Sequence, residues 1–313
     1  MSVKVFIDGS SGTTGLRIAD RLAQRPEIEL LSISAEGRKD VNERAKVINS
    51  ADLAFLCLPD AASKEVMPLL RPDVKVLDTS TAFRTDAAWD YGFPELKGQK
   101  EKIKNSDRVA VPGCYASGFI SIARPLVELG LAPASYPFSC TGISGYSGGG
   151  KKMIAEYEST DRPAHSKLDA PKSYGLGLAH KHLPEMQKIS GLAHTPMFVP
   201  VVCDYYCGMQ VLVPLDLKLA GTTAEAVAEG ITAYYKDAAT VKVHALNEAL
   251  PENGLYSNAM AGTDRMELYM TVNAAGDQMM LVSLFDNLGK GSSGAALQCM
   301  NLMLGLPETE GLE

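Results

Sequence analysis

Cys114 occupies a position at which a thiol can act as a nucleophile. It follows the strand-like run RVAVPG and precedes the helical stretch ASGFISIARPLVELG, so it lies at the corner where a helix begins. A helix N-terminus stabilises a thiolate, which is a strong nucleophile. Taken alone, the position fits catalysis and packing equally well. The other cysteines lie in apolar runs or beside a strand start and are expected to be packing residues: Cys57, Cys140, Cys203, Cys207 and Cys299.

A second strand-to-helix corner, DGSSGTTGLRI, is rich in glycine and follows the first strand-like run, VKVFID. Glycines let the backbone turn tightly and approach a diphosphate, and the helix N-terminus offers its amides and positive dipole to the phosphates. The spacing is G-x-x-G-x-x-G rather than the commoner G-x-G-x-x-G, and the alternative is a plain strand-to-helix turn. The residues expected to bind a dinucleotide are Gly9, Ser10, Gly12, Thr13, Thr14 and Gly15.

The segment SISAEGRKD, at the end of the second strand, bears on the choice between NAD and NADP. Glu36 would contact the ribose 2′-hydroxyl of NAD, whereas Arg38 and Lys39 would hold the 2′-phosphate of NADP. Position alone does not distinguish these roles from a solvated surface loop.

A nucleophilic thiol beside a nicotinamide domain suggests acyl chemistry. The thiolate attacks an acyl carbon or aldehyde, hydride passes between that carbon and the nicotinamide, and phosphate, water or CoA opens or forms the thioester. A histidine must act as acid and base. HKHLPEM supplies His180 and His182 with Glu185 close behind, and Pro184 predicts a helix start. The alternative is a basic surface cluster, and further metal ligands of suitable spacing are missing here and around Cys203, so no metal site is expected.

A Ser/Gly-rich corner, ISGYSGGGKKM at residues 143–153, precedes another helix-like stretch. Its backbone amides, Ser144, Ser147 and the cations Lys151 and Lys152 suit an anionic group such as an acyl phosphate. The alternative is a flexible loop with an exposed basic helix start.

The elements that must position these residues fall into two regions with different sequence patterns. Residues 1–113 alternate continuous apolar runs with helical stretches, which is typical of a parallel sheet buried on both faces and predicts a doubly wound, Rossmann-type α/β domain. Residues 114–287 carry longer β-rich runs with a few helices and predict an α+β catalytic and oligomerisation domain with a mixed sheet. The C-terminal segment 288–313 is expected to be helical and to complete the first domain.

Length and composition bound the remaining possibilities. The chain has 313 residues, which suits two domains, and a net charge of −7, which does not favour nucleic acid or an anionic membrane as partner. The N-terminus has no signal-like pattern, and no apolar run approaches the length needed to span a bilayer. Scattered cysteines in a chain of this size indicate free thiols in a reducing cytoplasm.

Several segments together resemble the short class of the N-acetyl-γ-glutamyl-phosphate reductase family of arginine biosynthesis, over essentially the whole chain. Any one segment would be unspecific, but their combination is highly specific. They are GSSGTTG, DTSTAFR (78–84), YGFPEL (91–96), PGCY (112–115), HKHLPEM and the C-terminal DNLGKGSSGAALQCMNLMLGLPETEGL.

The resemblance implies a role for each matching position. Cys114 would form the acyl-enzyme, and one of His180 and His182 would be the acid/base, with His180 weakly favoured as the first of the pair. The family often has Asn where this chain has Val111, and its longer class has Arg where this chain has Lys151. The resemblance also implies NADPH as reductant, Asn287 near the nicotinamide, and substrate contacts from Ser80, Arg84, Ser144, Ser147, Lys151 and Glu185.

The expected reaction is reductive dephosphorylation of a small acyl phosphate, N-acetyl-glutamyl 5-phosphate, to the semialdehyde. The expected assembly is a homo-oligomer, either a dimer or a tetramer. Two alternatives remain open. One is an enzyme of the same chemistry, of the aspartate-semialdehyde or glyceraldehyde-phosphate type. The other is a catalytically silent NADP-binding regulator, against which the intact Cys114, His180 and His182 argue.

Overall fold

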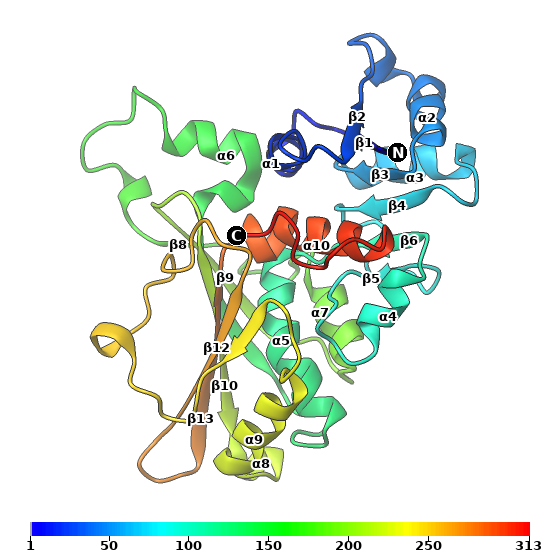
Figure 1. Cartoon of the computed structure of the whole chain (residues 1–313). Helices are drawn as coiled ribbons and strands as arrows, with labels where there is room; N and C mark the ends of the chain where they lie inside the picture. The colour runs from blue at the N-terminus through cyan, green and yellow to red at the C-terminus, as the bar shows by residue number, and fades with distance from the viewer. Residues whose placement is uncertain (1) are drawn as a thin grey trace. The chain divides into compact units, whose positions relative to one another are not determined.

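Two units, each with its own sheet, make up residues 2–313, the part of the chain that the computed structural model describes. The fold class is α/β with one parallel and one mixed sheet, as the sequence predicts (Figure 1). Unit 1 comprises the residues up to Pro94, Gly98–Pro112 and Ser292–Leu312, and unit 2 comprises Glu95–Lys97, Gly113–Gly291 and Glu313.

Unit 1 contains a six-stranded parallel sheet in the order β2-β1-β3-β4-β6-β5. Its strands are apolar because both faces are covered: all four residues of Leu53–Leu56 are buried. The strands are β1 (Val3–Asp8), β2 (Ile28–Leu31), β3 (Leu53–Leu56), β4 (Lys75–Asp78), β5 (Asp90–Tyr91) and β6 (Arg108–Ala110).

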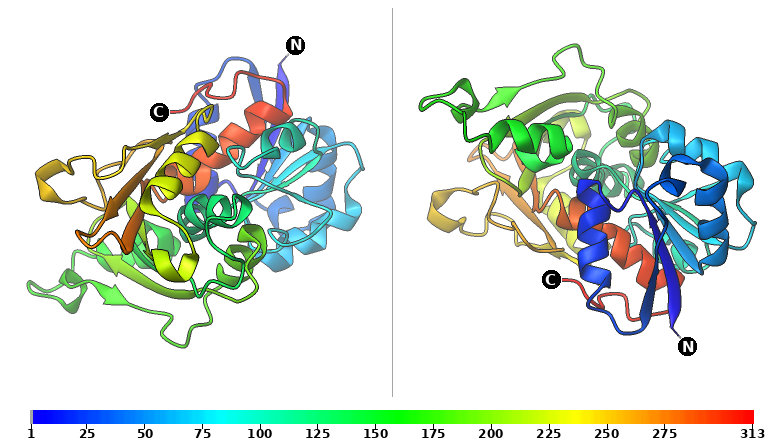
Figure 2. Two further views of the ribbon diagram at one scale, coloured as in Figure 1. Left: turned by 90° about the horizontal axis from the view of Figure 1, so that it is seen from below. Right: turned by 90° about the horizontal axis from the view of Figure 1, so that it is seen from above.

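Helices cover both faces of this sheet, which gives unit 1 its doubly wound architecture (Figure 2). Because strand side chains alternate, Val5 and Ile7 pack beneath α1 and α10, whereas Phe6 faces α2 and α3. The C-terminal helix therefore belongs to the core of unit 1. The helices are α1 (Thr13–Leu22), α2 (Val41–Ser50), α3 (Asp60–Val66), α4 (Gln99–Lys104) and α10 (Gly294–Met303), with short turns η1 (Gly37–Lys39) and η2 (Met67–Leu69).

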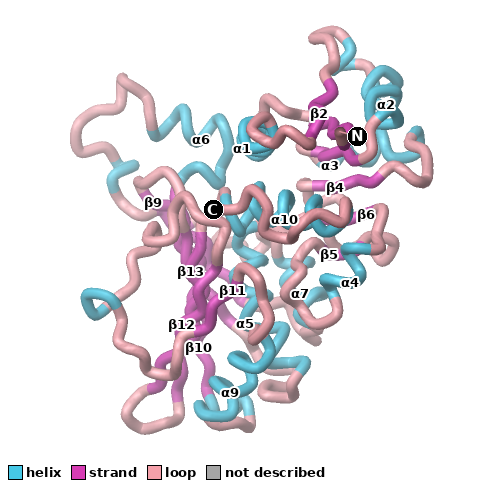
Figure 3. Tube along the Cα trace, viewed as in Figure 1, coloured by secondary structure: helices cyan, strands magenta, loops and turns pink. Residues whose placement is uncertain are grey.

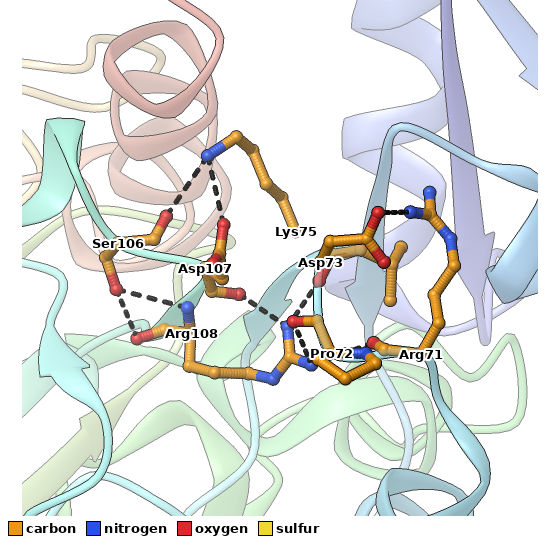
Figure 4. Close-up of polar contacts among 8 residues, drawn as sticks. Arg71, Pro72, Asp73, Lys75, Ser106, Asp107 and Arg108 are labelled. Atoms are coloured by element: carbon orange, nitrogen blue, oxygen red, sulfur yellow. Dashed lines mark hydrogen bonds and ion pairs between the residues drawn. The ribbon is translucent and has the colours of Figure 1, made fainter.

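The amino ends of β4 and β6 are closed by internal polar contacts (Figure 4). The Arg108 guanidinium donates to the backbone carbonyls of Asp107 at 2.8 Å and of Arg71 and Pro72 at 3.2 Å, and it also contacts Val74. Lys75 Nζ lies 3.3 Å from Asp107 Oδ1. Burial lowers the pKa of Arg108. These contacts tie loops to strands at this end, so the opposite, carboxyl end of the sheet is the one that can receive a ligand.

Unit 2 is built on a seven-stranded mixed sheet in the order β11-β12-β13-β10-β7-β9-β8 (Figure 3). The β11–β12 and β7–β9 pairs are parallel, and the other neighbours are antiparallel. The strands are β7 (Ser139–Gly145), β8 (Lys172–Ser173), β9 (Met197–Cys203), β10 (Met209–Asp216), β11 (Val241–Val243), β12 (Met266–Val272) and β13 (Gln278–Phe285).

Helix α5 (Cys114–Glu128) is the central helix of unit 2. It packs on β10 and β13, and α7 and α9 pack against it, so most of its side chains are buried. Among residues 2–313, no helix is long and apolar enough to cross a membrane. The other helices are α6 (Gly150–Tyr157), α7 (Leu183–Ser190), α8 (Leu217–Ala220) and α9 (Ala224–Tyr234), with short turns η3 (Tyr146–Gly149), η4 (Lys167–Asp169), η5 (Pro251–Asn253) and η6 (Gly289–Ser293).

Candidate active site

The glycine-rich corner after β1 has no room for a side chain at Gly9 or Gly15. Gly9 has a φ of 93°, and the Gly12 amide donates to the Gly9 carbonyl at 2.9 Å. A Cβ on Gly15 would collide with that same carbonyl. The N-cap of α1, Gly12, offers no side-chain hydrogen bond, and first-turn amides have no acceptor within their own helix. The corner therefore fits the diphosphate of a dinucleotide, which would satisfy these amides.

The corner lies at the point where the strand order of the sheet reverses. β1 pairs with β2 on one side and with β3 on the other, and a Cβ on Gly9 would lie 2.6 Å from the carbonyl oxygen of Cys57, just beyond β3. Ligands of doubly wound sheets bind at this reversal, outside the carboxyl ends of the strands. The glycine corner therefore lies where a dinucleotide is expected to bind, and its contact with one stays a prediction.

The loop after β2 is exposed. Glu36, Arg38 and Lys39 all have exposed side chains, and the loop is shaped by a hydrogen bond of 3.0 Å from the Gly37 amide to Ser34 Oγ. Because β2 is the parallel neighbour of β1, this loop and the glycine corner both follow the carboxyl ends of adjacent strands. The two cations are thus accessible to a ligand, and the choice between NAD and NADP stays a prediction.

Ser80 and Arg84 of the DTSTAFR segment make internal contacts in unit 1. Ser80 donates through its Oγ and its amide to Asp78 Oδ1, at 2.6 and 3.0 Å. Burial raises the pKa of Asp78. Arg84 donates to the carbonyls of Val111, at 2.9 Å, and Thr79, at 3.0 Å. Both candidates therefore shape the carboxyl ends of β4 and β6, and their contact with substrate stays a prediction.

Cys114 is the first residue of α5, as its sequence position predicts. The N-cap Gly113 makes no side-chain cap, and its amide donates to Glu185 Oε2 at 3.2 Å. Glu185 is buried on α7, so the HKHLPEM segment and the PGCY segment meet here. The structure therefore assigns Glu185 a contact with the backbone beside the thiol, which the sequence had not indicated.

The two histidines lie beside the residue that follows the thiol. The Tyr115 ring is 5.9 Å from that of His180 and 6.0 Å from that of His182, and the two imidazoles are 4.8 Å apart, centre to centre. His182 is buried, and its amide donates to His180 Nδ1 at 3.2 Å. Burial, with a smaller effect of Lys181, lowers the pKa of His180 to about 4. His180 is therefore neutral near pH 7, with its proton on Nε2 while this bond persists.

The buried hydroxyls of the Ser/Gly loop are held by neighbours within unit 2. Ser147 Oγ accepts from Asn287 Nδ2 at 3.0 Å, and Asn287 Oδ1 accepts from the Gly208 amide at 2.9 Å. Ser144 Oγ donates to the Gly145 carbonyl at 3.1 Å, whereas Lys151 is exposed on α6. Asn287, expected near the nicotinamide, thus has both ends of its amide engaged with the backbone and loop of unit 2.

Sequence reasoning missed two features around these residues. Tyr115 and Phe198 line the histidines, with a ring distance of 5.1 Å between His180 and Phe198. Lys290 is buried against Glu95, at 2.7 Å. The sequence contains one signal for Lys290. It is a lysine between two glycines in DNLGKGSSGAAL, a segment of mostly small and apolar residues in which a charged side chain is unexpected.

The profile "Semialdehyde dehydrogenase, NAD binding domain" matches residues 4–106, and the profile "Semialdehyde dehydrogenase, dimerisation domain" matches residues 114–287. An N-acetyl-gamma-glutamyl-phosphate reductase of Trichormus variabilis is 46% identical, with 99% of each chain covered. One of Burkholderia cenocepacia is 45% identical over 96% of this chain and 97% of its own.

The chain belongs to the N-acetyl-γ-glutamyl-phosphate reductase family. As a member of this family it is an oxidoreductase, and its NAD-binding domain makes the cofactor a nicotinamide dinucleotide. The dimerisation domain fits a homo-oligomer.

Solved structures with this fold lie further away in sequence. Aspartate semialdehyde dehydrogenase II from Vibrio cholerae has a TM-score of 0.68 at 17% identity, covering 97% of this chain and 99% of its own. The enzyme from Francisella tularensis has a TM-score of 0.70 at 15% identity, covering 96% and 100%. At such identities these dehydrogenases share the fold with this chain, whereas the relatives above share the family.

The remaining cysteines of this reductase-family chain form no disulfide within residues 2–313. Burial raises the pKa of Cys57 to about 12 and raises that of Cys140 further. Across the same residues, the structure contains no group of three or more His, Cys, Asp or Glu side chains close enough to hold a metal ion. A nucleophilic role for Cys114 stays a prediction.

Proposed function

We propose that this protein catalyses the NADPH-dependent reductive dephosphorylation of N-acetyl-L-glutamyl 5-phosphate to N-acetyl-L-glutamate 5-semialdehyde, in arginine biosynthesis. The observation that carries the proposal is the position of Cys114 at the start of α5, next to a tyrosine whose ring contacts both imidazoles. Relatives covering nearly the whole chain bear the name of this reductase.

The Cys114 thiolate is the nucleophile in this proposal. It attacks the acyl carbon of the substrate, a carbon–sulfur bond forms, and inorganic phosphate leaves, which gives a thioester. A bound nicotinamide dinucleotide supplies the hydride that reduces this thioester. The resulting thiohemiacetal oxygen returns its electron pair to the carbon, the carbon–sulfur bond breaks, and the aldehyde leaves with the thiolate restored.

The two histidines divide the proton work. His180 Nδ1 accepts the His182 amide, so its Nε2 carries the proton and can donate to the carbonyl oxygen on which charge develops. A pKa of about 4 keeps it neutral for that role but makes it a poor base. We therefore assign the removal of the thiol proton to His182, although the order of the pair in the sequence weakly favours His180.

The anionic ends of substrate and cofactor need separate cation and amide donors. We assign the phosphate to the Ser144–Lys151 loop, where Lys151 is exposed beside the N-terminus of α6. Ser80 and Arg84 border the carboxyl ends of β4 and β6, and we retain them as candidates for the substrate carboxylate. The glycine corner Gly9–Gly15 takes the diphosphate, and Arg38 and Lys39 take the 2′-phosphate that distinguishes NADPH from NADH.

A single assay tests the proposal in the reverse direction. Phosphate-dependent reduction of NADP is measured with N-acetyl-glutamate semialdehyde and, separately, with aspartate semialdehyde. We expect turnover with the first substrate that requires phosphate. Preference for aspartate semialdehyde would move the protein to the aspartate-semialdehyde type, and binding of NADPH without turnover on either would identify a silent regulator.

A further inference from the structure

Lys290 and Glu95 form a buried ion pair in unit 2. Lys290 Nζ lies 2.7 and 2.8 Å from the two carboxylate oxygens, and the side chains are 2% and 1% exposed. The Thr240 hydroxyl also contacts the same carboxylate. Burying both charges costs desolvation that their attraction barely offsets, so such a pair is weak evidence for stability. The ion pair instead fixes the direction and distance between the Lys290 and Glu95 side chains, which apolar contacts would not do.

Lys290 lies in an unusual turn. η6 (Gly289–Ser293) is π-helical, and the Gly291 amide donates to the Asp286 carbonyl at 2.9 Å. The carboxylate of Asp286 accepts from the amides of Leu288 and Gly262, both at 2.7 Å. Single π-helical turns are frequent at functional sites.

This turn lies directly against the thiol-bearing residue. A Cβ on Gly291 would be 3.0 Å from Cys114 Cβ. Asn287, which holds Ser147 and the Gly208 amide, lies two residues before η6, so the turn of residues 286–291 is also tied to this loop. Gly289 and Gly291 have no side chains with which to anchor the turn, so Lys290 between them is its anchor toward Glu95.

We propose that Lys290 is a positioning residue for the Cys114 thiol: its ion pair with Glu95 holds the 286–291 turn against Cys114 and keeps the thiol in its reactive orientation. The inference rests on the proposed function, since it assigns Cys114 the nucleophilic role. It adds that the YGFPEL segment, which supplies Glu95, and the DNLGKG segment act on catalysis through this contact without touching substrate.

The test uses the full-length protein and a probe that needs neither substrate nor cofactor. Iodoacetamide alkylates a thiolate by displacement of iodide, and mass spectrometry of the Cys114 peptide gives its rate between pH 6 and 9. Variants are Lys290→Met, Glu95→Gln and the double variant Lys290→Met/Glu95→Leu. Lys218→Met is the matched control, because Lys218 is an exposed lysine of unit 2 that lies 3.6 Å from Asp277.

We expect Lys290→Met and Glu95→Gln to lower kcat about 100-fold, because displacement of a reacting group by about 1 Å has an effect of that size. The alkylation rate at Cys114 should fall roughly tenfold, because a displaced thiol loses part of the thiolate stabilisation at the start of α5. KM for NADPH and the Lys218→Met control should not change. The double variant should recover the thermal unfolding midpoint, since an apolar pair of similar volume can replace a buried ion pair. It should not recover the alkylation rate.

Two results would overturn the inference. One is a normal alkylation rate at Cys114 in folded Lys290→Met or Glu95→Gln protein. The other is recovery of both stability and alkylation in the double variant, because the pair would then serve packing alone. Failure of the proposed function looks different: the alkylation differences between variants would persist while wild type shows no reductase turnover.

Discussion

The corner that opens α1 and the corner that opens α5 look alike but use their helix termini differently. Each helix has a glycine N-cap, Gly12 or Gly113, without a side-chain cap. At α1 a Cβ on Gly9 or Gly15 would collide with backbone, and the corner is partly exposed. At α5 Gly113 is buried and Cys114 is half-buried, and a carboxylate of the same unit, Glu185, accepts the N-cap amide at 3.2 Å.

The difference teaches that a glycine before a helix does not by itself make an anion site. At α1 no side chain caps the first-turn amides, so they can donate to a phosphate. This arrangement suits a ligand that carries two negative charges. At α5 a negative group of the protein already lies beside the terminus, which opposes a second anion and limits how far the helix can stabilise a thiolate. The predictions below test the two corners against each other.

The largest effect is expected at the α5 corner from Cys114→Ser. A hydroxyl is a poor nucleophile toward an acyl phosphate, so kcat should fall at least about 1,000-fold. NADPH binding, followed by fluorescence, should be unchanged because the glycine corner is intact. The control is Cys203→Ala/Cys207→Ala, which should keep full activity. A serine variant with nearly normal turnover would make Cys114 a structural thiol.

Substitution of the histidines should separate their roles. His182→Asn should lower kcat about 100- to 10,000-fold and flatten its pH dependence through loss of the base. His180→Asn should lower kcat about 100- to 1,000-fold through loss of the hydrogen-bond donor to the carbonyl oxygen, and it should keep the pH dependence. The measurement is steady-state kinetics on both variants. The opposite split would return the base to His180.

Stability against pH provides an independent check on His180. Burial lowers its folded-state pKa to about 4, below the ordinary histidine pKa of 6.5. Between these values the unfolded chain takes up a proton that the folded chain does not, so stability is lost as the pH falls from 6.5 toward 4. His180→Asn should remove this loss in urea unfolding series. Parallel curves for wild type and variant would show that the imidazole titrates normally.

The glycine corner should be broken in two distinct ways. Gly15→Ala forces a methyl group into the Gly9 carbonyl, and we expect the free energy of unfolding to fall by about 1–3 kcal/mol. Gly12→Ala is the matched variant, because its Cβ would lie 3.4 Å from the nearest atom. It should fold normally yet lose about tenfold in NADPH affinity by obstructing the diphosphate. Equal unfolding midpoints in the two variants would contradict this account of the turn.

The double variant Arg38→Ala/Lys39→Ala should weaken NADPH but not NADH. Loss of charge-assisted contacts in an exposed loop costs about 1–3 kcal/mol, or one to two powers of ten in affinity. The measurement is kcat/KM for both cofactors. Equal losses for both, or a wild type that prefers NADH, would show that Glu36 holds the ribose instead.

The smallest effect is expected from Glu185→Gln. The amide oxygen can still accept from Gly113, but the negative charge beside the α5 terminus is gone, so the thiolate fraction at neutral pH should rise. Alkylation of Cys114 at pH 7 should accelerate a few-fold. A slower rate would mean that Glu185 positions the corner and does not oppose the thiolate.

Much of the fold could be predicted from local patterns. Continuous apolar runs predict the parallel sheet, because strands buried on both faces need no polar side, and α10 is predicted from the apolar segment after Ser293. Gly9–Gly15 and Pro112-Gly113 predict where α1 and α5 begin, since these residues turn the chain locally. Such features depend on neighbours within a few residues, so the sequence alone determines them.

Only the tertiary structure decided which partner each buried polar group received. Glu185 faces Gly113, 72 residues away, Asn287 holds Ser147, 140 residues away, and Lys290 meets Glu95, 195 residues away. The His180 tautomer likewise depends on a backbone amide brought near by the turn into α7. A buried donor or charge must be satisfied, but which acceptor lies within about 3 Å depends on how sheets and helices pack, and no local pattern records that.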